Sequence, residues 1–302
     1  SQAGGQQPAA QSTQPAPEEE EEPVGGDGGE IFVTGVRPGQ VIGDIPPENS
    51  LGPRDIRATG ASDITELLDA LAPQIGSARG RGGERPVLLL NGQRISGFRE
   101  LRDIPTEAIE RVDILPEEVA LKYGFRADQR VVNIVLRPRF RSTAGRVEGR
   151  TATDGGYGGG HAEMTQLRIN RDARVTVNLR AEGNGALTEA ERDIVPQDPA
   201  APDERDARTL VGSRRLVRGT ATANKTILGG VSATLNTELE HSEGRSLLGL
   251  SDFALEPLAR TTDSDSAHVG LSLNGNEGKW RWSLTGNGDV AQSITYTDRD
   301  DE

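Results

Sequence analysis

The second half of the chain alternates apolar and polar residues with a period of two. Residues 175–182 alternate valine, leucine and alanine with polar or charged side chains, and the same pattern recurs in 231–240, 269–274 and 280–285. Successive side chains of a strand point to opposite faces, so this pattern predicts strands with one apolar and one polar face. Several strands reach the roughly 9–11 residues needed to cross a bilayer. The pattern favours a transmembrane β-barrel with a wet lumen over a soluble sandwich.

The predicted connections between these strands are of two kinds. Residues 170–172 and 276–278 read as tight turns, whereas 186–206 and 244–265 read as long polar loops. Outer-membrane barrels have short turns at one end and long loops at the other. The connections therefore support the barrel.

Residues 30–140 predict a mixed α/β unit of short elements. Asp63 can cap a helix with apolar residues at 64, 67, 68 and 71, and Pro73 is expected to stop it. Val87–Leu90 reads as a buried strand and Asn91-Gly92 as the tight turn that follows it.

The rest of this unit alternates short helices with strands. Pro105 and Pro116 each suit the first turn of a short helix, and Gly124 can end the second helix in a left-handed cap. Val112–Leu115 and Arg130–Leu136 read as strands.

Composition excludes several classes of protein. The 302 residues include no Cys, which excludes disulfide scaffolds, Cys-ligated zinc and thiol catalysis. Lys and Arg number 34 against 47 Asp and Glu, so the charge balance argues against nucleic acid. Residues 1–29 are rich in Gln, Ala, Pro, Gly and Glu and are expected to form a disordered tail. The start at Ser1-Gln2-Ala3 is compatible with an exported protein after signal cleavage.

The sequence contains no complete catalytic or metal-binding motif. His161, His241 and His268 lack ligand spacing, and the Gly-rich stretch 155–160 lacks the Lys-Ser/Thr of a phosphate loop. We therefore expect no enzyme, no metal site and no cofactor.

Four sequence blocks resemble the plug domain of TonB-dependent outer-membrane receptors. Val87–Gly92 followed by Ile104–Leu115 resembles the family's "IDG" turn and "IPxxxIERIEVL" helix and strand. Val131–Val135 resembles the "GGVINI" strand that closes the plug, and Glu30–Gly35 resembles the Ton box "EIVVTG". The blocks come in the family's order.

The sequence also departs from the family's pattern. Leu115–Glu118 stands where the family has "RGP", and Tyr123–Arg130 replaces a Gly-rich segment. The resemblance is therefore to a divergent branch.

The resemblance implies a fold and a division of the chain. The expected fold is a mixed α/β plug domain followed by antiparallel transmembrane β-barrel strands, with the barrel incomplete. The expected segments are a tail at 1–29, a Ton-box-like segment at 30–36, a plug at 37–140 and the first barrel strands at 141–302. A plugged barrel of this family has 22 strands, so we expect the N-terminal part of a longer protein.

The resemblance also implies binding residues. The Ton box would pair with the C-terminal domain of TonB as an added strand; its residues are Glu30, Ile31, Phe32, Val33, Thr34 and Gly35. A basic cluster is expected at the contact of plug and barrel, comprising Arg126, Arg130, Arg137, Arg139 and Arg141. These arginines would pair with lumen acids such as Glu148, Glu182 and Glu238, or bind substrate.

The implied function is uptake of a scarce ligand through a plugged barrel, energised by the inner-membrane TonB complex. The expected location is the outer membrane of a Gram-negative bacterium, with the N-terminal tail in the periplasm and lipid around the barrel. The alternative is a receptor-like scaffold that anchors or assembles an envelope complex with partner proteins and does not transport. A soluble periplasmic β-domain is a third interpretation. The ligand's identity stays open.

Overall fold

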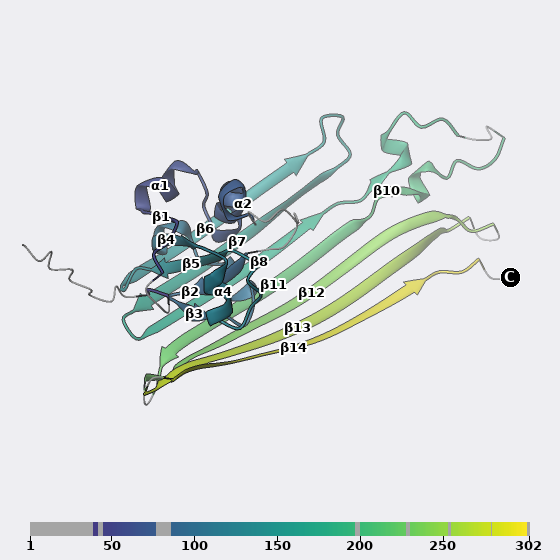
Figure 1. Cartoon of the computed structure of the whole chain (residues 1–302). Coiled ribbons are helices and arrows are strands. Elements are labelled where there is room, and N and C mark those ends of the chain that lie inside the picture. Colours follow the sequence, from purple (N-terminus) through teal and green to yellow (C-terminus); the bar gives the residue numbers. More distant parts are fainter. Residues whose placement is uncertain are drawn as a thin grey trace, which may run out of the picture. The chain divides into compact units, whose positions relative to one another are not determined.

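The computed structural model describes residues 39–41, 45–76, 86–196, 200–227, 230–252, 255–278 and 280–300. Short helices and strands alternate from Asn49 to Leu136, and long strands dominate from Phe140 to Thr297 (Figure 1). The described residues contain no helix with the length and apolar character needed to cross a bilayer. Most of the described residues lie in strands, and nearly all strand pairs are antiparallel, as predicted.

The first part is an α/β domain built on a five-stranded sheet. Its strand order is β1-β4-β5-β2-β3, in which β2 runs parallel to β5 and the other pairs are antiparallel. The strands are β1 (Asn49–Leu51), β2 (Val87–Leu90), β3 (Gln93–Arg94), β4 (Ile109–Leu115) and β5 (Val131–Leu136). The helices are α1 (Pro53–Ala58), α2 (Ile64–Ile75), α3 (Arg99–Arg102), η1 (Thr106–Ala108) and α4 (Glu118–Lys122).

Helix α2 begins as predicted and ends later than predicted. The Asp63 carboxylate accepts a hydrogen bond from the Glu66 N–H at 3.0 Å, which caps the helix. The helix then continues two residues past Pro73. Proline so near the helix end removes few backbone hydrogen bonds, and the Gly76 N–H still donates to the Ala72 carbonyl. The prediction that Pro73 stops the helix is therefore wrong.

The turn between β2 and β3 has the residue types that a tight hairpin turn requires. Asn91 and Gly92 have φ angles of 50° and 72°, as a tight hairpin turn requires. A Cβ at Gly92 would lie 2.5 Å from the Gln40 carbonyl oxygen. This turn is confirmed, and it holds the backbone of Gln40 close to the domain.

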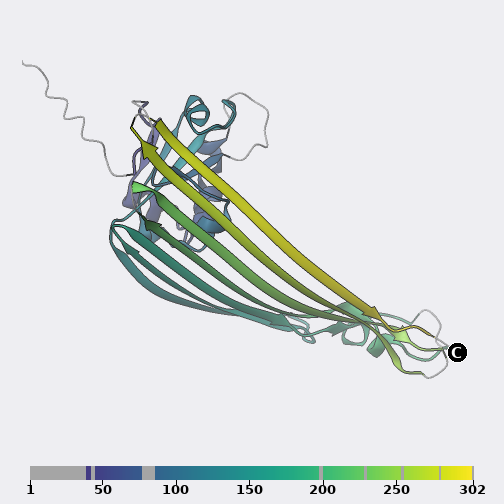
Figure 2. The same ribbon diagram turned by 90° about the horizontal axis from the view of Figure 1, so that it is seen from below.

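The second part is a seven-stranded antiparallel sheet, which we call the long sheet. Its order is β14-β13-β12-β11-β8-β7-β6, and Figure 2 shows the strands running side by side. The strands are β6 (Phe140–Thr151), β7 (Gly158–Asn170), β8 (Ala173–Asn184), β11 (Ser213–Thr226), β12 (Ser232–Leu250), β13 (Pro257–Glu277) and β14 (Trp280–Thr297). The sheet is open, because β6 and β14 are its edges and do not pair with each other.

The connections of the long sheet follow the prediction in part. The turns after β7 and β13 are tight, and the segment between β8 and β11 is long. That segment contains β9 (Leu187–Thr188), η2 (Glu189–Glu191), η3 (Arg205–Ala207) and β10 (Thr209–Val211). The predicted loop at 244–265 is wrong, because β12 extends to Leu250 and β13 begins at Pro257. Residues 244–246 and 260–265 contain no apolar side chain, so the alternation that identifies a strand disappears in these stretches.

Candidate functional site

The long sheet buries polar side chains on one face and exposes apolar side chains on the other. In β8, Val175, Val177 and Leu179 are 48%, 37% and 57% exposed, whereas Thr176 and Asn178 between them are 3% exposed. In β12, Leu235 and Leu239 are likewise exposed, and the alternating residues Ser232, Thr234, Asn236 and Glu238 are buried. We call these the apolar face and the polar face of the sheet.

The polar face is ordered in rows by the strand register. Asn178, Thr220, Glu238, His268 and Asp289 are register partners on five successive strands, from β8 to β14. Side chains of directly paired residues lie on the same face of a sheet. The register therefore places two acids, one amide, one hydroxyl and one imidazole in a continuous band.

Helix α3 contacts this band. The α3 helix is anchored in the α/β domain by Leu101, which is fully buried. The Ser96 N–H and hydroxyl both donate to Glu100 at 3.1 and 3.3 Å, which fixes the turn that precedes the helix. This anchoring leaves the charged side chains on either side of Leu101 free to face the long sheet.

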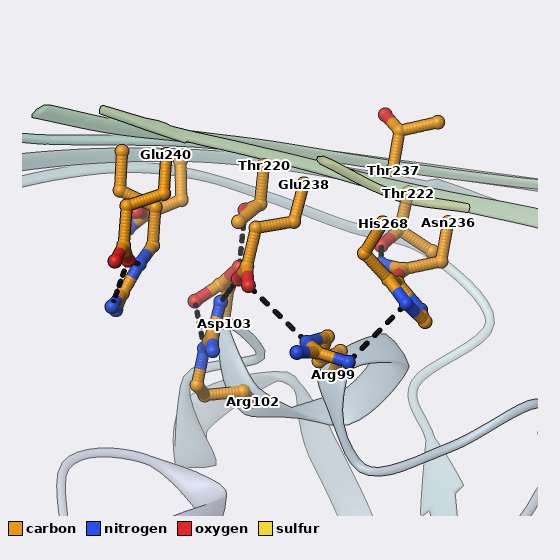
Figure 3. Close-up of polar contacts among 12 residues, drawn as sticks. Arg99, Arg102, Asp103, Thr220, Thr222, Asn236, Thr237, Glu238, Glu240 and His268 are labelled. Carbon is orange, nitrogen blue, oxygen red and sulfur yellow. Dashed lines mark hydrogen bonds and ion pairs between the residues drawn. The ribbon is translucent and has the colours of Figure 1, made fainter. Parts of the chain in front are cut away.

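Two arginines of α3 share one carboxylate of the long sheet (Figure 3). The Arg99 Nε donates to Glu238 Oε1 at 3.2 Å, and Arg102 donates to the other oxygen of Glu238. Asp103 accepts a hydrogen bond from the Thr220 hydroxyl and also pairs with Arg102. These charge-assisted bonds join segments more than a hundred residues apart.

His268 and Asp289 extend the same cluster. The Arg99 Nη1 lies 3.3 Å from Asp289 and 3.2 Å from His268 Nδ1, which is itself 2.8 Å from Asp289. The Nδ1 atom can donate to Asp289 or accept from Arg99, but one tautomer cannot do both. Arg99 thus has alternative partners within reach.

A second ion pair between the two parts is buried. Arg174 of β8 donates to the Glu100 carboxylate at 3.4 Å and to the Glu100 carbonyl at 3.2 Å. Both side chains are at most 4% exposed. Burial raises the pKa of Glu100, and Arg174 only partly offsets this. Such a pair costs desolvation energy, so losing one partner would be more harmful than replacing both.

The cluster has a further carboxyl group with a shifted pKa. Burial raises the pKa of Asp103, against the opposing effects of Thr220 and Arg102. The balance between burial and these two partners thus sets the proton affinity of the Asp103 carboxyl group.

Backbone contacts bring the segment before α3 still closer. Asn287 donates to the Ser96 carbonyl at 2.9 Å, and Asn274 donates to the Arg94 carbonyl at 3.1 Å. A Cβ at Gly270 would lie only 2.7 Å from the Ser96 hydroxyl. Glycine at this position thus permits the approach.

The predicted arginines are not part of this charged cluster. Glu30, Ile31, Phe32, Val33, Thr34 and Gly35 are outside the described residues. Arg126 pairs with Asp128 and Arg130 with Glu48, both within the α/β domain. Among the residues that the structure describes, Arg137, Arg139 and Arg141 form no ion pair.

The predicted partners of these arginines are also engaged by other groups. Glu148 pairs with Arg146, Glu182 with Arg180, and Glu238 with Arg99 and Arg102. The predicted pairing of Arg126, Arg130, Arg137, Arg139 and Arg141 with these acids is therefore wrong. The sequence signal that was missed is Arg99-Glu100-Leu101-Arg102-Asp103, where four charged residues surround one buried leucine.

The cluster offers binding by paired charges. Within the described ranges, no group of three or more His, Asp and Glu side chains could hold a metal ion. Paired charges hold two surfaces together and can exchange one partner for another or for water. The arrangement is suited to docking one part of the chain onto another.

Comparison with known proteins finds a curated relative but no family. No family model matches the chain. It is 28% identical over 188 residues to the ferric enterobactin receptor of Pseudomonas aeruginosa, a match that covers 57% of this chain and 24% of the relative. The chain thus spans about a quarter of the length of the curated relative that it matches.

Solved structures also match, with low scores. The siderophore receptor PirA from Pseudomonas aeruginosa has a TM-score of 0.37 and 14% identity, covering 84% of this chain and 49% of that one. The ferric preacinetobactin receptor BauA from Acinetobacter baumannii has a TM-score of 0.29 and 17% identity, covering 82% and 47%. Scores this low add nothing to the sequence match. The curated relative confirms the resemblance to TonB-dependent outer-membrane receptors that the four sequence blocks predict.

Proposed function

We propose that this chain contributes the plug and the first barrel strands of an outer-membrane receptor that takes up a scarce ligand with energy supplied through TonB. The observation that carries the proposal is the inverted polarity of the long sheet. A soluble sheet would turn the Val175, Val177 and Leu179 face toward a core, whereas here that face is the exposed one. Lipid is the solvent that suits such a face.

The docking of the α/β domain on the polar face supports the role of a plug. A domain held by ion pairs such as Arg99–Glu238 and Arg102–Glu238 can separate from a wall by exchanging its partners for water. An apolar contact would have to expose its apolar area, which costs about 25 cal/mol per Å². We infer that this contact is the one that yields when the receptor opens.

The N-terminal segment is the proposed binding segment for TonB. Glu30–Gly35 resembles the Ton box and lies a few residues before Gly39. The Gly39 carbonyl accepts a hydrogen bond from Asn133 of β5 at 2.8 Å. A pull on the preceding residues would therefore load the central sheet of the α/β domain directly.

The ligand is proposed only at the level of class. The curated relative is a ferric enterobactin receptor, so ferric siderophores are the first candidates to test. The relative extends far beyond the part that this chain matches, and its name carries over to this chain only as a hypothesis.

Deleting Glu30–Gly35 tests the proposal. We expect the variant to reach the outer membrane at the normal level and to lose energised uptake of radiolabelled ferric siderophores. Deleting the acidic run Glu18–Glu22 is the matched control and should leave uptake intact. Uptake that survives the first deletion would contradict the TonB role.

The same experiment separates transport from scaffolding. A non-transporting scaffold would show no uptake in the wild type, and its envelope complex would assemble with or without Glu30–Gly35. That result would replace the receptor proposal with the scaffold.

A further inference from the structure

A basic cavity lies between the α/β domain and the ends of β13 and β14 that join in a tight turn. Its volume is about 230 Å³, and its lining contains three cationic side chains and no carboxylate. The cations are Arg94, Lys122 and Arg281, and amide side chains that line the same cavity include Gln40, Gln93 and Asn274. We call this the basic cavity.

The positive charge of the cavity is not neutralised within the described part of the chain. None of Arg94, Lys122 and Arg281 forms an ion pair with a described carboxylate. The chain as a whole has a formal net charge of −13. Three cations that have no ion-pair partner among the described residues surround one hollow, and together they create a local potential that attracts an anion.

Arg94 is held in place for such a role. Its guanidinium lies over the Phe125 ring at 4.5 Å from the centroid, and its Nε is buried without a hydrogen-bond partner. Its carbonyl accepts the hydrogen bond from Asn274 of β13. Stacking leaves the edge of a guanidinium available for the paired hydrogen bonds that phosphate and carboxylate oxygens accept.

The three cations come from both parts of the molecule. Arg94 and Lys122 belong to the α/β domain, whereas Arg281 belongs to β14. An anion in the cavity would therefore bridge the domain and the long sheet. It would also contact Gln40, the segment through which the N-terminal residues enter the domain.

We propose that the basic cavity binds a phosphate group and that the bound group strengthens the docking of the α/β domain on the long sheet. The phosphate can belong to a free ion or to the headgroup of an anionic lipid. Trp280 and Trp282, at the same end of β14, are 80% and 42% exposed. Tryptophan prefers the headgroup level of a bilayer, so lipid phosphate would be present at this height.

Thermal unfolding of the purified chain in detergent tests this proposal. Sodium phosphate is titrated against sodium chloride at equal ionic strength, and we expect a saturable rise of Tm in phosphate alone. Arg94→Gln, Lys122→Gln and Arg281→Gln should each weaken the apparent phosphate affinity about tenfold, as loss of one charge-assisted bond implies. Arg215→Gln, an exposed position on β11 outside the cavity, is the matched control and should respond like the wild type.

Lipid nanodiscs distinguish the two sources of phosphate. A Tm rise with free phosphate supports a small-ion site, and a rise only in phosphatidylglycerol nanodiscs over phosphatidylcholine supports a headgroup site. In either case the rise must shrink in the cavity variants. Absence of both effects, or equal effects in wild type and variants, would overturn the proposal. Lys122 and Arg281 are exposed, so their variants test it even if Arg94→Gln fails to fold.

Discussion

The α/β domain and the long sheet follow opposite rules of burial. In the domain, Leu67 and Leu101 are 1% and 0% exposed and pack in an apolar core. In the long sheet, Leu179 is 57% exposed, and its polar neighbour Asn178 is 3% exposed. The α/β domain thus has an apolar interior, whereas the long sheet exposes its apolar face. The side chains are similar, and the surrounding solvent decides which face is stable.

The largest expected difference comes from the same substitution made in each part. Leu67→Ala in α2 should destabilise the domain by about 3–5 kcal/mol, because it leaves a cavity in a packed core. Leu179→Ala, on the apolar face of β8, should cost less than about 1 kcal/mol in detergent. Urea-dependent hydrogen exchange of the α2 and β8 amides measures the two effects separately. Equal costs at both positions would remove the contrast between the two parts.

A charge placed on each face of the long sheet sharpens the comparison. Leu179→Arg on the apolar face should cost about 2–4 kcal/mol in a bilayer, as for a charge facing lipid near the membrane centre. Ala291→Arg is the matched control, because Ala291 of β14 is exposed on the polar face of the long sheet. Assembly into lipid vesicles, followed by gel mobility, measures both. A tolerated Leu179→Arg would show that this face does not meet lipid.

The third prediction concerns the charges that join the two parts. Glu238→Gln leaves Arg99 and Arg102 without their shared carboxylate and should weaken docking by about 1–3 kcal/mol. Because the chain has no native Cys, a single cysteine reports on docking. The Asn236→Cys thiol, at a position 1% exposed, should react faster with a water-soluble maleimide when Glu238→Gln is added.

The control for this experiment lies on the same strand. Glu243, which is exposed on the other face of β12 beside His241, should give unchanged labelling as Glu243→Gln. An unchanged rate in Glu238→Gln as well would show that these ion pairs do not hold the domain.

The smallest predicted effect is a pH dependence of docking. The pKa values of Glu100 and Asp103 are raised by burial, so the folded protein holds these protons more tightly than the unfolded chain. Stability from this source is therefore present at low pH and is lost as pH rises through the raised values. Asp103 faces Arg102, Thr220 and, at longer range, Glu163.

The variant Asp103→Asn isolates this contribution. It should reduce the change of Tm with pH between about pH 4, where carboxyl groups ordinarily titrate, and neutral pH. Asp128→Asn, within the α/β domain beside Arg126, is the control. A profile that keeps its slope in Asp103→Asn would place the pH dependence elsewhere.

Local signals predicted the elements whose cause is local. The cap at Asp63, the turn at Asn91-Gly92 and the strand alternation around Val175 each depend on a few neighbouring residues, and each is present. The end of α2 beyond Pro73 and the strands in 244–265 were missed because packing and register, which are long-range, decide them.

The contact between the two parts could not be derived from sequence spacing. Arg99 and Glu238 are 139 residues apart in the sequence, and they meet where the buried Leu101 anchors α3 in the α/β domain. The arginines near the junction of the two parts, such as Arg130 and Arg137, are close to the long sheet in sequence, and nearness in sequence was the wrong criterion. Charged residues beside a buried leucine are the better signal.

The most direct test of the inverted sheet is the accessibility of spin labels along β12. Single cysteines at 233, 235, 237 and 239, and at the alternating positions 232, 234, 236 and 238, are labelled in this otherwise Cys-free chain in lipid vesicles. We predict that oxygen, which concentrates in lipid, relaxes labels at the odd positions and not those at the even positions. If a water-soluble nickel chelate relaxes the odd positions instead, that face meets water and the account is contradicted.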